Sequence, residues 1–95
     1  MSTIKKIKNS FNAILVSTDP DFILSFINAI ISGLSGVYGM VRGDLSAAND
    51  LLESAKEACK MGNIRKAQSE LKKLEALFNR VSSNVQIEIA KVIPS

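Results

Sequence analysis

Apolar side chains recur every three or four residues over most of this chain, which is the period of an amphipathic α-helix. The first run contains Ile4, Ile7, Phe11 and Ile14 and predicts a helix over residues 3–17. The chain therefore opens with a helix that has one apolar face and one polar face.

A stop-and-start signal follows this first helix. Asp19 is suited to cap a new helix, Pro20 to occupy its first position, and Asp21 to complement the positive end of its dipole. Apolar residues then continue at helical spacing up to the pair Gly43-Asp44, which we interpret as a helix end and a new cap. The pattern predicts a second helix over residues 20–42.

Two further helices are predicted in the second half of the chain. One covers residues 45–61 and ends at Gly62-Asn63, in the manner of a left-handed cap. The last covers residues 64–92, with a candidate break at 82–84. Residues 85–93 also alternate as a strand would, but a lone strand would have no partner, so we favour a helix.

These elements define an all-α protein of about four helices in an up-down or hairpin-type bundle. Ninety-five residues suffice for one domain with one modest core. We divide the single domain 1–95 into a basic amphipathic N-terminal helix (1–18), an apolar small-residue helix (20–42) and a helical hairpin (45–93).

The composition argues against catalysis. The chain has no His and a single cysteine, Cys59, so a zinc site would lack its usual ligands and a thiol nucleophile would lack a base. Cys59 lies on an apolar stripe and is better explained as a small buried side chain. We therefore expect no enzyme activity, no catalytic residue, no metal, no cofactor and no small-molecule substrate.

The uncharged segment 22–41 has two interpretations. Twenty uncharged residues can cross a bilayer, and small residues four positions apart allow close helix approach. The same features suit a buried helix that packs tightly in a bundle or an assembly, which we favour. The predicted self-association face comprises Ile23, Ile27, Ala29, Ile30, Ser32, Gly33, Leu34, Gly36 and Gly39.

Basic residues are spaced seven apart along the last predicted helix, so they form a stripe on one helix face. Such a stripe can follow a phosphate backbone, although a solvated face with Lys66–Glu70 and Glu70–Lys73 pairs would need no ligand. The net charge is only +3. The candidate nucleic-acid-binding residues are Arg65, Lys66, Lys72, Lys73 and Arg80, together with Lys5, Lys6 and Lys8.

An apolar helix at 22–41 and a basic stripe at 65–80 within so short a chain resemble the small all-helical major capsid proteins of archaeal rod- and spindle-shaped viruses. The resemblance covers an architecture and no aligned stretch. It implies a repeated, self-assembling coat subunit whose basic face contacts nucleic acid.

Two other classes of protein remain open. One is a small membrane protein or filament subunit with a single span at 22–41, and the other is a soluble helical adaptor. We expect no signal peptide, because the N-terminal apolar run is about four residues long and Asp19-Pro20-Asp21 follows it. The expected location is intracellular or in a virion, with membrane association as the alternative.

Overall fold

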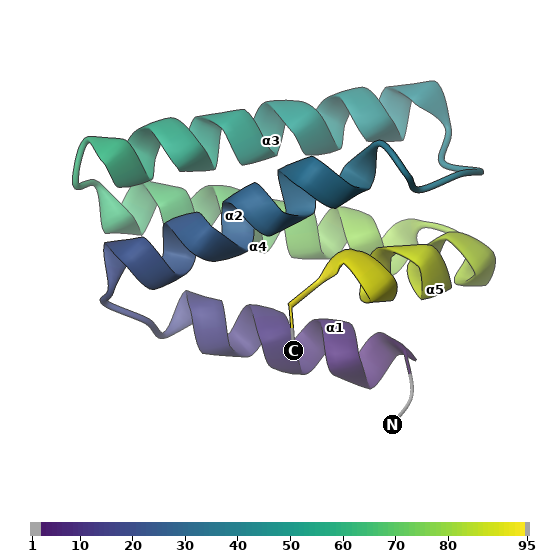
Figure 1. Cartoon of the computed structure of the whole chain (residues 1–95), viewed down its shortest axis with the longest axis horizontal. Helices are drawn as coiled ribbons and strands as arrows, with labels where there is room; N and C mark the ends of the chain where they lie inside the picture. The colour runs from purple at the N-terminus through teal and green to yellow at the C-terminus, as the bar shows by residue number, and fades with distance from the viewer. Residues whose placement is uncertain (1–2, 95) are drawn as a thin grey trace.

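The described part of the chain folds into five α-helices (Figure 1). The computed structural model describes the backbone of residues 3–94 and the side chains of residues 5–94. The helices are α1 (Thr3–Leu15), α2 (Pro20–Leu34), α3 (Arg42–Lys60), α4 (Ile64–Arg80) and α5 (Ser83–Val92). The all-α prediction is confirmed, with five helices in place of about four.

The helices form two layers. In Figure 1, α3, α4 and α1 lie beside one another in the rear layer, with α4 in the middle, and α2 and α5 lie in front of them. The neighbouring helices α3 and α4 form an antiparallel hairpin joined by a short turn. The molecule measures 35 × 28 × 19 Å, and its shortest extent matches two helix layers.

Three phenylalanine rings pack at the centre of the core. Phe11 of α1 packs edge to face against Phe26 of α2, with ring centroids 5.2 Å apart, and against Phe78 of α4, with centroids 6.0 Å apart. Such edge-to-face pairs add to the stabilisation from burial alone. Because the three rings come from three helices, these contacts hold the front layer on the rear layer.

The second helix is shorter than the sequence predicted. It ends at Leu34 rather than at residue 42, and residues 35–41 form a loop. Gly and Ser have low helix propensity, so the Ser- and Gly-rich stretch from Ser32 onward favours an end of the helix. Gly39 adopts a left-handed conformation with φ 88°, which no helix can contain.

Three other boundaries differ from the prediction. The first helix ends at Leu15 rather than at residue 17. The third begins at Arg42, so Gly43-Asp44 lies within its first turn, where Asp44 complements the helix dipole. The last predicted helix is divided in two, because Val81 is extended and the Ser82 hydroxyl caps α5 by accepting a hydrogen bond from the backbone N–H of Val85.

Side chains of other helices donate hydrogen bonds to carbonyl groups at the C-terminal ends of two helices, α1 and α4. Gln68 donates to the carbonyl oxygens of Ile14 and Ser17 at the end of α1, at 3.3 and 2.7 Å. Gln86 donates to those of Phe78 and Asn79 at the end of α4, at 3.1 and 3.4 Å. The last carbonyl groups of a helix have no partner within it, so these bonds fix where neighbouring helices meet.

Candidate nucleic-acid interface

The outward face of α4 is cationic along its whole length. Eight residues of α4 are exposed: Arg65, Lys66, Ser69, Lys72, Lys73, Ala76, Asn79 and Arg80. Five of them are basic and none is acidic. The structure thus brings all five predicted residues of the stripe together on one face of one continuous helix.

This face is held in place by the packing of the opposite side of α4. Ala67, Leu71, Leu74 and Phe78 are fully buried at the helical period, so the side chains between them must point outward. At the N-terminus, the Asn63 side chain accepts a hydrogen bond of 3.1 Å from the backbone N–H of Lys66. The basic residues therefore project from a capped and well-packed helix.

The basic residues of α4 form two parallel rows. Arg65 and Lys72 lie on one side of the outward face, and Lys66 and Lys73 lie on the other, because each pair is separated by seven residues. Small side chains lie between the rows. From residue 65 to residue 80 the face is about 22 Å long. It is a cationic strip without large apolar side chains.

The acidic residues of α4 lie at the edges of this strip. Glu70 forms an ion pair with Lys73, in which Lys73 Nζ lies 3.2 Å from Glu70 Oε1. The Glu70 side chain is only 16% exposed, whereas the Lys73 side chain is 63% exposed. Of the two pairs expected from the sequence, Glu70–Lys73 is thus present. An i,i+3 pair in which the lysine stays exposed contributes little to stability and leaves the lysine accessible to a ligand.

The basic character does not extend to the adjacent helix. The exposed face of α3 carries Asp50, Glu53 and Glu57 near its centre, with Arg42 and Lys60 at its two ends. Phosphate groups would be repelled by these carboxylates and attracted by α4, so the charge distribution orients an anionic ligand toward α4.

The three N-terminal lysines have different environments. Lys8 is exposed and lines a groove between α1 and α4 with Asn12, Glu75 and Asn79, so it lies next to the strip. Lys5 is exposed on α1. Lys6 differs from both: its ammonium donates a 2.7 Å hydrogen bond to the carbonyl oxygen of Ala90, at the C-terminal end of α5. One of its three N–H donors is thus engaged within the chain.

Four of the nine residues of the predicted self-association face are not on the surface. Ile23, Ile27, Ile30 and Leu34 are at most 2% exposed and belong to the chain's own core. The helical period was correct, but the core of a single copy accommodates these side chains. They are therefore unavailable to a second copy in this fold, and that part of the prediction is wrong.

The small residues of the same face have separate surroundings. Gly33 packs against Val92 of α5. Gly36 and Gly39 lie in the loop after α2. Ser32 is exposed, and Ala29 is half-buried. Two of the three glycines thus lie outside the helix on which the small-residue face was predicted.

The transmembrane interpretation of residues 22–41 required one long helix. Among the described residues, no helix combines the length and the apolar character needed to cross a bilayer.

Cys59 is buried in α3, and this burial raises the pKa of its thiol by disfavouring the charged thiolate. The same described residues hold no cluster of three potential metal ligands.

Comparisons with protein-family models, with curated proteins and with solved structures gave no match. The resemblance to archaeal virus capsid proteins therefore stays a prediction.

Proposed function

We propose that this protein is a non-enzymatic nucleic-acid-binding protein that holds the phosphate backbone along α4. The observation that carries the proposal is that α4 exposes five basic side chains and no acidic one over about 22 Å. Binding of this kind releases condensed counterions and needs no base-specific contact.

Contact is expected with the backbone rather than with the bases. Contacts to phosphate oxygens carry no sequence information, whereas sequence is read by groups that reach the edges of bases in the grooves, and Arg and Lys side chains can make either kind of contact. Ser69 and Ala76, which lie between the two basic rows, have short side chains. The protein is therefore expected to bind without marked sequence preference.

An acidic lipid surface is the other large polyanion that a basic helix could meet. Helices that bind at membrane interfaces insert an apolar face, usually with Trp, Phe or Leu, below the lipid headgroups. The apolar face of α4 lies in the protein core, and its exposed face contains no large apolar side chain. These features favour nucleic acid.

A matched pair of variants tests the proposal. Replacing Lys66, Lys73 and Arg80 with Gln removes three positive charges from the strip, and replacing Lys56, Lys60 and Lys91 with Gln removes three from α3 and α5. Affinity for a short DNA duplex would be measured by fluorescence anisotropy at fixed salt. For wild type, a Kd between about 10⁻⁶ and 10⁻⁴ M is expected.

The variant of α4 should bind more than tenfold more weakly, and the control should bind nearly as tightly as wild type. Equal losses in the two variants would mean that net charge alone drives binding, which contradicts a defined interface. Stronger binding of wild type to vesicles rich in acidic lipid than to DNA would overturn the choice of ligand.

A further inference from the structure

Tyr38 is the most exposed aromatic residue in the described part of the chain, at 82%, and it lies in the loop of residues 35–41 between α2 and α3. The loop is fixed to the rest of the molecule on both sides of Tyr38. Val37 is buried in the core, and Gly39, whose φ of 88° turns the chain, lies beside Val85 of α5. An anchored loop thus holds an aromatic ring that is open to solvent.

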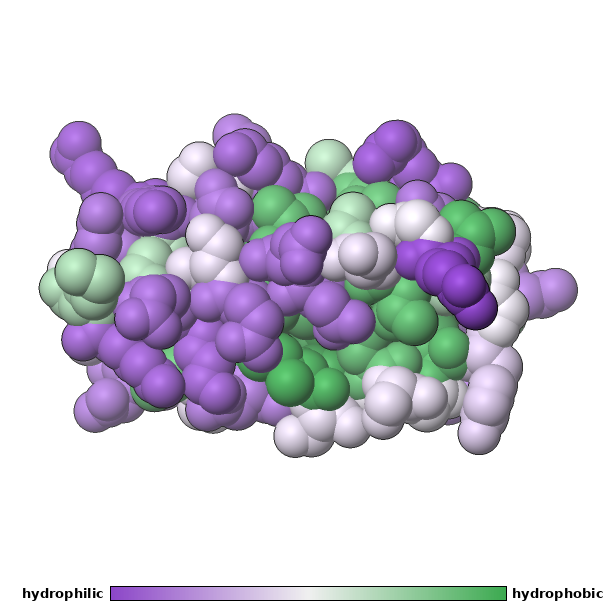
Figure 2. Space-filling view, turned by 90° about the horizontal axis from the view of Figure 1, so that it is seen from above, coloured by the Kyte–Doolittle hydropathy of each residue, from purple (hydrophilic) through white to green (hydrophobic). Residues whose placement is uncertain are grey.

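This loop meets the C-terminal end of the basic strip of α4. Gly39 and Arg80 line the same hollow, of about 170 Å³. In Figure 1, the loop and the end of α4 lie at the same end of the molecule. Figure 2, which views the molecule from above, shows apolar side chains gathered toward this end. The fold therefore brings Tyr38 close to the basic strip, although the two are far apart in the sequence.

The charges at this end of the molecule favour an anionic ligand. Arg80 forms no ion pair within the described residues, where the two ion pairs are those of Lys73 and Lys91. Arg42, the first residue of α3, is exposed directly after the loop. Asp44 is the one acidic residue that lines the hollow, and it is half-buried. Positive charge therefore prevails beside the loop.

Proteins that hold single-stranded nucleic acid combine a positively charged surface for the backbone with aromatic side chains on which bases stack. The basic strip of α4 supplies the first of these and Tyr38 the second. We propose that Tyr38 is the stacking contact for an unpaired base of a single strand whose phosphates lie along α4. This inference rests on the proposed function and adds the class of nucleic acid that the protein prefers.

Stacking on Tyr38 agrees with binding that does not read sequence. Every base has a flat π-face, so an aromatic ring accepts any of the four. In a duplex the bases already stack on one another, and away from the duplex ends none is open to Tyr38. The ring should therefore strengthen binding to a single strand and contribute little to binding of a duplex.

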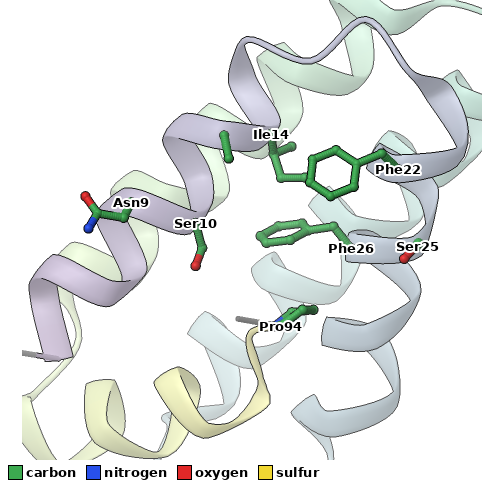
Figure 3. A pocket seen from close by; sticks show the side chains of 8 residues that line it. Asn9, Ser10, Ile14, Phe22, Ser25, Phe26 and Pro94 are labelled. Atoms are coloured by element: carbon green, nitrogen blue, oxygen red, sulfur yellow. The ribbon is translucent and has the colours of Figure 1, made fainter. Parts of the chain in front are cut away.

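Phe22, the other aromatic residue at the surface, has different surroundings. Figure 3 shows its ring pointing, with that of Phe26, into an apolar cleft between α1 and α2, which Ile14 and Pro94 also line. No basic residue lines this α1–α2 cleft. Phe22 thus lacks the neighbouring positive charge that holds a nucleic-acid backbone, and Tyr38 has it.

The test uses the intrinsic fluorescence of the full chain, which has one tyrosine and no tryptophan, so that its emission reports on Tyr38 alone. Titration with a single-stranded oligothymidylate of about twelve nucleotides should quench this emission, because a base stacked on the ring deactivates its excited state. A parallel titration of free tyrosine amide corrects for absorption by the oligonucleotide. A blunt DNA duplex should bind and leave the emission nearly unchanged.

Three variants identify the ring as the cause. Tyr38→Ala should bind the oligothymidylate about 5- to 100-fold more weakly, which is the usual effect of losing one stacked base, and the duplex as wild type does. Tyr38→Phe keeps the ring and should bind both as wild type does. Met61→Ala is the matched control, because Met61 is 78% exposed and lines a hollow with Lys66 at the other end of the strip but has no ring.

Two results would overturn the stacking contact directly. One is an oligothymidylate that binds without quenching Tyr38, and the other is a Tyr38→Ala variant that binds it as tightly as wild type. Equal losses in Tyr38→Ala and Met61→Ala would also contradict the proposal, because exposed apolar surface rather than an aromatic ring would then account for both.

The salt dependence of binding separates this proposal from the proposed function. Tyr38→Ala removes no charge, so it should lower the affinity without changing the salt slope, whereas replacing Lys66, Lys73 and Arg80 with Gln should reduce the slope. A reduced slope in that α4 variant together with an unquenched Tyr38 refutes the stacking contact alone. A quenched Tyr38 with an unchanged slope in the α4 variant places the backbone elsewhere and refutes the proposed function.

Discussion

Gly33 of α2 and Val92 of α5 are in direct contact, and no side chain fits between the two helices at this point. A Cβ atom placed on Gly33 would lie 2.8 Å from Val92 Cγ2 and closer still to Cγ1. The glycine therefore lets α5 approach α2 within one copy of the chain.

The first prediction concerns this contact. Gly33→Ala should lower the free energy of unfolding by about 1–3 kcal/mol, because the added methyl group overpacks the junction of α2 and α5. Urea unfolding followed by circular dichroism measures the loss. Gly43→Ala is the control: an added Cβ there meets no atom within 4 Å, and the helical position should gain up to about 1 kcal/mol.

If steric overlap is the cause, Val92→Ala should relieve much of the loss when it is combined with Gly33→Ala. A double variant whose destabilisation equals the sum of the two single losses would contradict a direct clash.

The second prediction concerns the buried amide of Gln86, which is 6% exposed and donates to two carbonyl groups at the end of α4. Gln86→Met keeps a side chain of similar length but removes the donor. The variant should be about 1–3 kcal/mol less stable, because one buried and one partly buried carbonyl group lose their partner.

Gln68→Met is the comparison for Gln86→Met, since Gln68 makes the same kind of bond to α1 but is only partly buried. Gln68→Met should lower the free energy of unfolding by less than Gln86→Met does, because water can reach the carbonyl groups that lose their partner. The urea midpoints of both variants provide the measurement, and the opposite order would refute this account of the helix ends.

The third prediction separates a structural lysine from binding lysines. Lys6→Met removes the hydrogen bond to Ala90 and should cost roughly 1 kcal/mol of stability, with little change in DNA affinity. Lys66→Met, on the exposed face of α4, should show the reverse pattern. Parallel urea titrations and anisotropy measurements test both. A loss of DNA affinity in Lys6→Met as large as that in Lys66→Met would return Lys6 to the interface.

The fourth prediction follows from the raised pKa of Cys59. Burial stabilises the neutral thiol in the folded state, so its contribution to stability is complete below the ordinary thiol pKa and is lost as pH rises through the folded-state pKa. Wild type should thus lose stability at alkaline pH by more than Cys59→Ala does. Alkylation of native Cys59 should also be much slower than that of the urea-unfolded chain, and equal rates would contradict burial.

The periodic features of the sequence were sufficient to predict most of the fold. Apolar spacing located the helices, and the cap at Asp19 and the left-handed Gly62 have the predicted conformations. The basic strip was predictable for the same reason, because seven-residue spacing on a helix needs no knowledge of other elements. Local patterns of this kind are readable without the tertiary structure.

The remaining features depend on contacts between distant parts of the chain. The partners of Lys6 and Gln86 are carbonyl groups of other helices, and no local pattern indicates which carbonyl a side chain will reach. The end of α2 depends on a balance between weak helix propensity and the packing of the loop. The α1–α2 cleft combines residues from α1, α2 and the C-terminal segment after α5, so its lining cannot be read from any one stretch of sequence.

The salt dependence of DNA binding tests the central claim most directly. If all five basic residues of the α4 strip contact phosphates, log K should fall with log salt concentration with a slope between about −4 and −5. Replacing Lys66, Lys73 and Arg80 with Gln should reduce the slope to about −2, and the Lys56/Lys60/Lys91 control should keep the wild-type slope. An unchanged slope in the α4 variant would show that this face does not bind nucleic acid.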